Sequence, residues 1–289
     1  MTGDSARPIG VFDSGVGGLT VARALIDLMP GEPLVYIGDT ARYPYGNKPA
    51  ADVRRFAREL AESLVRDHDV KMIVVACNTA ASVALDVLVR DMPVPVIGVV
   101  EPGARALVRV THNERVGVIG TVGTIASGAY DRAVAATGVQ VELTSAACPG
   151  FVEFVERDNT DGPEVTVLAE RLLAPMRDAG VDALLLGCTH YPFLAPVIQR
   201  VMGDGVVLVS SASETAFAVR DELDRRRARA TDNTADNTAD NTVDNTVDGT
   251  PARHKFMSSG DIEQFARLAR RLLGPEVVSV EPWRLGATS

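Results

Sequence analysis

Two stretches decide the fold: Val75-Ala76-Cys77-Asn78-Thr79 and Leu186-Gly187-Cys188-Thr189-His190. Each follows a short apolar run and continues into polar residues at which a helix can start. A cysteine therefore stands at the carboxyl end of a predicted buried strand in both stretches. They lie about one domain length apart along the chain. This spacing predicts two related units, each with a cysteine at the sheet edge where open α/β folds bind their ligands.

Short β-branched runs alternate with amphipathic stretches along most of the chain, which is typical of βα units around a parallel sheet. In residues 53–66, for example, Phe56, Leu60 and Leu64 recur at helical spacing. After residue 98 the series starts again, which predicts a second sheet built like the first. The predicted strands are 9–12, 34–37, 72–75 and 96–98 in the first sheet, and 116–119, 139–143, 183–186 and 206–209 in the second.

Residues 232–248 differ from the rest, since they repeat Asp-Asn-Thr-Ala or Asp-Asn-Thr-Val with a period of four. Such a repeat has no apolar stripe to bury. We therefore expect a disordered surface insertion over residues 231–250, with a compact functional loop as the alternative. It separates a predicted helix at 214–229 from a strand near 255–257 and a capped helix at 261–273. We expect residues 1–98 and 210–289 to form one domain and residues 99–209 the other.

The composition is that of a globular protein, with 46% hydrophobic and 23% charged residues. A net charge of −9 argues against a surface that coats nucleic acid. The amino terminus lacks the apolar stretch of a secretory signal, and no apolar run is long enough to span a membrane. The three cysteines form no CxxC pair. We expect a cytoplasmic protein with reduced thiols.

Cys77 and Cys188 are the first candidates for chemistry. A free cysteine is most often a small buried hydrophobe, but Cys148, in a Pro-Gly turn, does not share their setting. Backbone N–H groups at a helix start stabilise a thiolate and lower the thiol pKa from about 8.5. Two thiols across a cleft can remove a proton from one face of a carbon and return one to the other. A redox pair is the alternative; a metal site is disfavoured because His190 is the only further ligand nearby.

Three further motifs accompany the cysteines. Asp13-Ser14-Gly15-Val16-Gly17-Gly18 follows the first strand; it fits neither a P-loop nor a dinucleotide fingerprint, but it offers a backbone nest for a carboxylate and an acidic side chain. A simple helix cap is the alternative. His190, two residues past Cys188, can exchange protons with a thiol near neutral pH. The turn Tyr43-Pro44-Tyr45-Gly46 either closes a site or is a structural turn only.

At these places the sequence resembles the glutamate racemases of bacterial cell-wall synthesis, within the aspartate/glutamate racemase family. The resemblance runs from about residue 9 to residue 210 and is looser in the tail. The motifs that carry it, in the family's order, are Phe12-Asp13-Ser14-Gly15-Val16-Gly17-Gly18-Leu19, Pro44-Tyr45-Gly46, Ala76-Cys77-Asn78-Thr79-Ala80 and Gly187-Cys188-Thr189-His190-Tyr191-Pro192.

The resemblance implies an α/β fold of two pseudo-symmetric, doubly wound domains. Their central sheets are mostly parallel, and the active site lies in the cleft between them. It also implies an isomerase that converts L-glutamate to D-glutamate for peptidoglycan synthesis, without pyridoxal phosphate, metal or nucleotide. By similarity, Cys77 and Cys188 are the catalytic thiols.

Further residues are implied in the same way. Asp13 and His190 would assist the thiols, and Glu156 matches the family's acidic residue, although Glu153 stands where proline is expected. The residues expected around the substrate are Asp13, Ser14, Tyr45, Gly46, Asn78, Thr79, Thr189 and His190.

Two other functions stay open. An aspartate racemase would share the fold and both cysteines, but enzymes of that type resemble Cys-Thr-Glu at the second cysteine, so His190 favours glutamate. From a different class, a ligand-binding module could use the cysteines to sense redox state. We expect a small-molecule partner (glutamate), a homodimer, and no membrane or direct nucleic-acid binding. Some family members are reported to bind DNA gyrase, and no motif here decides on that contact.

Overall fold

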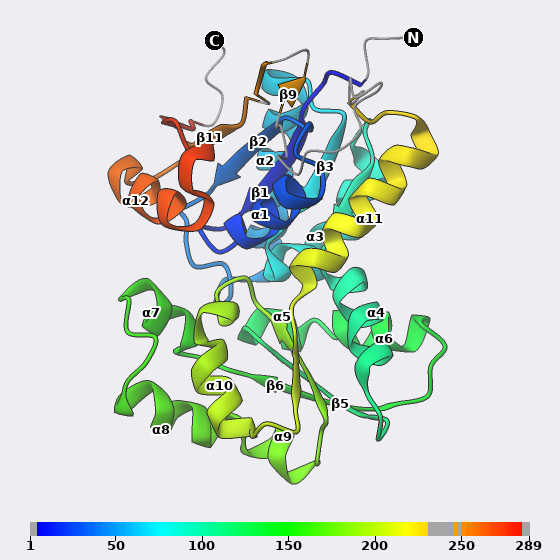
Figure 1. Cartoon of the computed structure of the whole chain (residues 1–289), viewed down its shortest axis with the longest axis vertical. Helices are drawn as coiled ribbons and strands as arrows, with labels where there is room; N and C mark the ends of the chain where they lie inside the picture. Colours follow the sequence, from blue (N-terminus) through cyan, green and yellow to red (C-terminus); the bar gives the residue numbers. More distant parts are fainter. Residues whose placement is uncertain (1–4, 231–245, 248–249, 252, 285–289) are drawn as a thin grey trace, which may run out of the picture.

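The computed structural model describes residues 5–230, 246–247, 250–251 and 253–284. Two bodies make up the molecule, each built around a parallel sheet with helices on its faces (Figure 1). The upper body contains β1 (Ile9–Asp13), α1 (Leu19–Leu28), β2 (Leu34–Gly38), α2 (Ala50–His68), β3 (Met72–Val75), α3 (Asn78–Asp91), β4 (Val96–Gly98), β11 (Lys255–Ser258), α12 (Ile262–Leu273), η2 (Gly274–Glu276) and β12 (Val280–Pro282).

The lower body follows β4 along the chain. It contains β5 (Arg115–Gly120), α5 (Val122–Ala126), α6 (Ala129–Ala136), β6 (Glu142–Ala147), α7 (Phe151–Glu156), α8 (Pro163–Leu172), α9 (Ala174–Asp178), β7 (Ala183–Gly187), η1 (Tyr191–Leu194), α10 (Ala195–Met202) and β8 (Val207–Val209). Two helices connect the bodies, α4 (Val100–Val110) and α11 (Ser211–Arg226). Because α11 packs on both α1 and α4, it ties the bodies together.

Four strands of the upper sheet have the same topology as the lower sheet. The upper sheet has the strand order β12-β11-β2-β1-β3-β4 and the lower one β6-β5-β7-β8, and all pairs in both are parallel. The segment β2-β1-β3-β4 therefore has the same order as the whole lower sheet. All residues of β1, β2, β3 and β7 are buried, as expected for parallel strands covered on both faces. The predicted α/β fold with two parallel sheets is confirmed.

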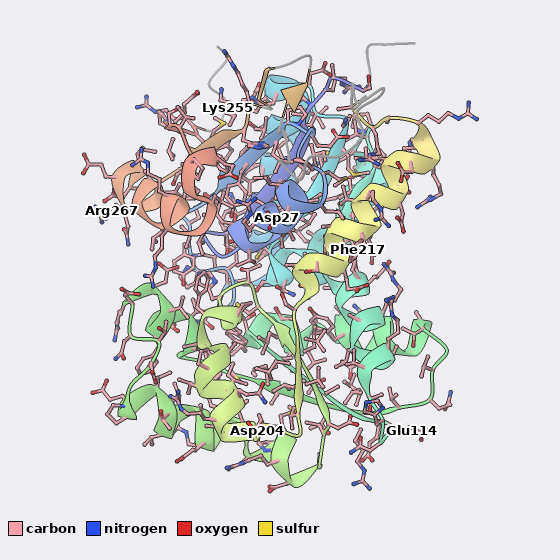
Figure 2. The ribbon with its side chains drawn as sticks, in the orientation of Figure 1. Asp27, Glu114, Asp204, Phe217, Lys255 and Arg267 are labelled. Atoms are coloured by element: carbon pink, nitrogen blue, oxygen red, sulfur yellow. The ribbon has the colours of Figure 1, made fainter. Side chains whose placement is uncertain are left out.

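Both sheets direct the carboxyl ends of their strands at the junction between the bodies. Lys255 begins β11 at the far end of the upper body, and Glu114, directly before β5, lies at the far end of the lower one (Figure 2). Because the strands within each sheet are parallel, all their carboxyl ends face the junction. This is where open α/β sheets bind ligands.

Some predicted elements differ from the observed ones. The strand expected at 139–143 lies further along the chain, as β6 (Glu142–Ala147). Pairing with β5 determines its position, and the paired residues Thr144-Ser145-Ala146-Ala147 show no apolar pattern from which it could be predicted. β12 was not predicted. Most of the expected insertion at 231–250 lies outside the described residues; within it, β9 (Thr246–Val247) pairs antiparallel with β10 (Thr250–Pro251). The domain boundaries at residues 98 and 209 stay predictions.

Candidate functional site

A small cavity lies where the strand ends of the two sheets meet. Its free volume is about 20 Å³, space for roughly one water molecule. An amino acid can therefore enter only if the walls move apart. A larger cavity of about 500 Å³ lies between α2, α3, α4 and α6 but contains neither Cys77 nor Cys188. The small cavity is lined by Ser14, Tyr43, Pro44, Tyr45, Gly46, Cys77, Asn78, Thr79, Thr121, Val152, Cys188, Thr189 and His190.

Each sheet contributes its topological switch point to this cavity. In the upper sheet, Asp13 ends β1 and Cys77 follows β3, and the chain leaves these neighbouring strands in opposite directions across the sheet. In the lower sheet, Thr121 follows β5 and Cys188 follows β7 in the same arrangement. The two cysteines therefore occupy equivalent places in the two halves and line one space from opposite sides.

Cys77 caps the first turn of α3. The backbone N–H of Ala80 donates to its sulfur at 3.5 Å, and the thiol donates to the Ser14 hydroxyl at 3.6 Å. Burial nevertheless raises the pKa of the Cys77 thiol to about 12, and the nearby Asp13 carboxylate adds to the shift. The expected lowering of this pKa at a helix start is therefore wrong for Cys77. The hydrogen bonds from Ala80 and Ser14 do not offset the desolvation of the thiol.

Cys188 belongs to a chain of three groups. Its sulfur lies 3.9 Å from Nδ1 of His190, and Nε2 of His190 lies 2.8 Å from Oε1 of Glu156. Burial alone would lower the pKa of His190, but the bonds to Cys188 and Glu156 raise it to about 10. The imidazole is thus held in its charged form beside the sulfur of Cys188.

The segment after Cys188 is not the α-helix start that the sequence predicts. It forms a turn and then the 3₁₀ helix η1 before α10 begins. Pro192 and Pro196 have no N–H, so neither can bond to the carbonyl four residues earlier. The N–H groups of Tyr191 and Phe193 instead bond three residues back, to Cys188 and His190.

Asp13 connects the two bodies at the bottom of the site. Its side chain is fully buried, accepts the Gly15 N–H at 2.9 Å and accepts the Thr189 hydroxyl at 3.4 Å. Burial raises the pKa of Asp13, while the charge of His190 acts in the opposite direction. Asp13 does not line the cavity, but a carboxyl group with a raised pKa close to Cys77 and bonded to Thr189, the neighbour of Cys188, is suited to exchange protons with the site.

The remaining predicted residues also lie here, with one change of role. The Tyr45 hydroxyl donates to the buried Asp39 carboxylate, which is not part of the cavity wall, so this hydroxyl is engaged within the protein. Gly46 approaches the lower body closely: a Cβ there would lie 2.7 Å from Cβ of Thr121. Glu156 reaches the site through His190 and does not line the cavity. Asn78, Thr79 and Thr189 line it as predicted.

Four lining residues were not among the predicted site residues: Tyr43, Pro44, Thr121 and Val152. Thr121 had a usable signal, because it follows β5 as Ser14 follows β1, the equivalent strand of the other half. Tyr43 stood inside a quoted turn but was not assigned to the site. Val152, on α7, had no sequence signal.

Residues 5–230, 246–247, 250–251 and 253–284 contain no group of three or more His, Cys, Asp or Glu side chains placed to hold a metal ion. None of the helices in these ranges is long and apolar enough to cross a membrane.

The family model described as Asp/Glu/Hydantoin racemase matches residues 18–219. The chain belongs to the Asp/Glu/Hydantoin racemase family. This family member is an isomerase, and the resemblance carried by the four motifs is confirmed.

The relatives of this racemase match it over nearly its whole length. Glutamate racemase of Corynebacterium kroppenstedtii is 50% identical over 276 residues, which cover 94% of this chain and 96% of that protein. The structure of glutamate racemase isoform RacE1 from Bacillus anthracis has a TM-score of 0.86 at 38% identity, covering 98% of this racemase and 100% of that chain. Glutamate racemase of Francisella tularensis, solved with D-glutamate, has a TM-score of 0.85 at 31% identity, with 98% and 100% coverage.

Proposed function

We propose that this racemase interconverts L- and D-glutamate without a cofactor, with Cys77 and Cys188 as its two acid/base groups. The observation that supports the proposal most directly is that both thiols line one small cavity from equivalent positions of two sheets. Racemisation requires a proton to leave one face of the α-carbon and another to arrive at the opposite face. Two groups on opposite walls meet this requirement without any rotation of the substrate.

Glutamate is the proposed substrate because relatives that share about 50% of their sequence with this chain over nearly its whole length are glutamate racemases. A structural neighbour is a glutamate racemase solved with D-glutamate. His190, which follows Cys188 and Thr189, favours glutamate over aspartate as the substrate. The proposed substrate contacts are Asp13, Ser14, Tyr45, Gly46, Asn78, Thr79, Thr189 and His190, of which Tyr45 would act through its ring or backbone, since its hydroxyl is bonded to Asp39.

We propose that the two thiols start from different protonation states. A pKa of about 12 keeps Cys77 protonated at neutral pH, and the charged imidazole of His190 lies beside the sulfur of Cys188. In the proposed L-to-D reaction, the Cys188 thiolate takes the α-proton and becomes a thiol. The Cys77 thiol gives its proton to the opposite face of the carbanion and becomes a thiolate. The D-to-L reaction starts from that second state, and proton exchange with solvent restores the first.

Charge develops on the substrate carboxylate during proton removal, so nearby donors lower the barrier. The first turn of α3 at Asn78 and Thr79 offers backbone N–H groups beside Cys77. Asp13, which lies near Cys77 and bonds to Thr189 beside Cys188, is the proposed relay that exchanges protons with the thiols.

The proposed physiological role is supply of D-glutamate for peptidoglycan, and hence for the cell wall and cell shape. It is supported by the likeness to bacterial glutamate racemases. The cytoplasmic location and the homodimer stay predictions, and the DNA gyrase contact stays open.

The test is an assay of purified protein on L-glutamate in deuterated water, with no added cofactor. We expect D-glutamate to form with solvent deuterium at the α-carbon, and aspartate to turn over poorly. Faster turnover of aspartate would place the chain with aspartate racemases. No turnover of either, together with reversible oxidation of the cysteines, would favour the redox-sensing module.

A further inference from the structure

Tyr43 lines the cavity between the two cysteines, and its side chain carries a donor group that stays unused. The hydroxyl oxygen of Tyr43 is buried and has no hydrogen-bond partner among the described residues. Every other polar side chain of the cavity wall takes part in at least one hydrogen bond within the protein. These bonds join Cys77 to Ser14, Asn78 to Tyr130, Thr79 to Thr121, Thr189 to Asp13, His190 to Cys188 and Tyr45 to Asp39.

The Tyr43 ring is held firmly. Its centroid lies 5.7 Å from that of the His190 ring at an interplanar angle of 38°. On another side it packs on Gly15, where a Cβ would lie only 3.1 Å from Cδ2 of Tyr43. Burial raises the pKa of the Tyr43 hydroxyl, and the nearby Glu156 and Cys188 add to the shift. The hydroxyl therefore stays protonated and keeps its capacity to donate.

One acceptor in the same cavity is also unused. Oδ1 of Asn78 is buried without a partner in the described part of the chain, while Nδ2 of the same side chain donates to the Tyr130 hydroxyl at 2.6 Å. The wall thus presents one unmatched donor and one unmatched acceptor. An amino acid carries the complementary pair, because its carboxylates only accept hydrogen bonds and its ammonium group only donates them.

We propose that Tyr43 is a substrate-binding residue whose hydroxyl donates a hydrogen bond to a carboxylate oxygen of the amino acid between Cys77 and Cys188, while Asn78 Oδ1 accepts from its ammonium group. This inference rests on the proposed function and adds a contact to it. A buried hydroxyl without a partner is unfavourable in the free protein and becomes satisfied when substrate binds. Its hydrogen bond therefore contributes to substrate affinity and contributes nothing to the stability of the fold.

The test is Tyr43→Phe, which keeps the ring on His190 and Gly15 and removes only the hydroxyl. Loss of a hydrogen bond to a charged group should raise KM for both enantiomers roughly ten- to a hundredfold, with kcat changed by less than about twofold. The melting temperature should not fall, since no bond within the protein is lost. The increase in melting temperature caused by D-glutamate should become smaller.

Tyr191→Phe is the matched control, because the Tyr191 hydroxyl donates to the Cys148 carbonyl at 3.1 Å and lies outside the cavity wall. It should lower the melting temperature and leave KM near the wild-type value. An unchanged KM in Tyr43→Phe, or a fall in its melting temperature alone, would overturn the inference. If the wild-type protein did not racemise glutamate, the proposed function would fail. The Tyr43 contact would then be judged by the D-glutamate melting shift, and an equal shift in both proteins, or none, would refute it.

Discussion

Oε1 of Glu156 lies 2.8 Å from Nε2 of His190, so a partly exposed carboxylate on α7 helps, together with Cys188, to raise the pKa of an imidazole that is almost fully buried. The other ring nitrogen of His190 faces the sulfur of Cys188 at 3.9 Å. Glu156 can therefore influence the thiol without touching the cavity. We propose that Glu156 is a positioning residue, like the carboxylates behind metal-bound histidines.

Glu156→Gln should lower kcat/KM for glutamate by roughly tenfold. This is the lower end of the loss usually seen when a residue that hydrogen-bonds a functional side chain from behind is replaced. The value of kcat/KM must fall by the same factor for L-glutamate and for D-glutamate, because the two enantiomers have the same free energy and the equilibrium constant between them is one. Loss of the negative charge disfavours the imidazolium, so the pKa of His190 falls. The alkaline limb of the pH profile should accordingly move to lower pH. Glu153→Gln, a neighbouring carboxyl on α7 without a bond to His190, is the control and should leave that limb in place.

His190 should also make the stability of the protein depend on pH. Its pKa is about 10 in the folded protein and about 6.5 when unfolded, so between these values the folded state binds more protons. Its stabilising contribution is therefore complete below about pH 6.5 and is lost as the pH rises through about 10. The measurement is the unfolding free energy of wild type minus that of His190→Asn across this window. A difference that stays constant with pH would contradict the assignment.

Gly17→Ala should impair catalysis and leave each body folded. A Cβ at Gly17 would lie 2.4 Å from the Thr189 hydroxyl oxygen and 2.8 Å from Nδ1 of His190, both in the other body. The two walls would have to separate, and a displacement of about 1 Å can cost about a hundredfold in rate. We expect kcat/KM to fall by about that factor with little change in circular dichroism. Gly205→Ala, where a Cβ meets nothing within 4 Å, should behave like wild type.

The sequence identified the parts of the fold whose signal is local. Strands β1, β2, β3 and β7 are buried on both faces, so they appear as uninterrupted apolar runs. β6 and β12 gave weak signals because they lie at sheet edges and are defined by their partners. Cys77 and Cys188 could be located because each directly follows such a buried strand.

The properties of the site that the sequence did not predict depend on its three-dimensional surroundings. The pKa of Cys77 is determined by complete burial beside Asp13, which is 64 positions earlier in the chain, and no local motif reports this. The unused hydroxyl of Tyr43 becomes apparent only once the partners of every neighbouring group are known. Burial and hydrogen-bond satisfaction are properties of the assembled cavity.

A buried ion pair away from the site provides a test of stability. Lys71 and Glu32 are 2.6 Å apart with side chains 1% and 3% exposed, and Lys71 also donates to the carbonyls of Ser5 and Ala228. Lys71→Met leaves a buried carboxylate unpaired and should lower the unfolding free energy by about 3–5 kcal/mol. Lys255→Met removes a more exposed pair with Glu281 and should cost at most about 1 kcal/mol. Equal costs in chemical denaturation would show that burial does not govern this pair.

The division of labour between the thiols is tested most directly by Cys77→Ser and Cys188→Ser. Each should abolish racemisation in both directions, since a full turnover needs both groups and serine is far less acidic than cysteine. Proton removal alone needs one base, so each variant should still eliminate a leaving group from one enantiomer of a β-substituted analogue. The family resemblance assigns Cys188 to the L-enantiomer and Cys77 to the D-enantiomer, so Cys77→Ser should act on the L-analogue and Cys188→Ser on the D-analogue.

The control is Cys148→Ala, which replaces a buried cysteine outside the cavity wall and should racemise within a few-fold of wild type. Near wild-type racemisation by either serine variant would refute the two-thiol mechanism, because the remaining thiol can reach only one face of the α-carbon.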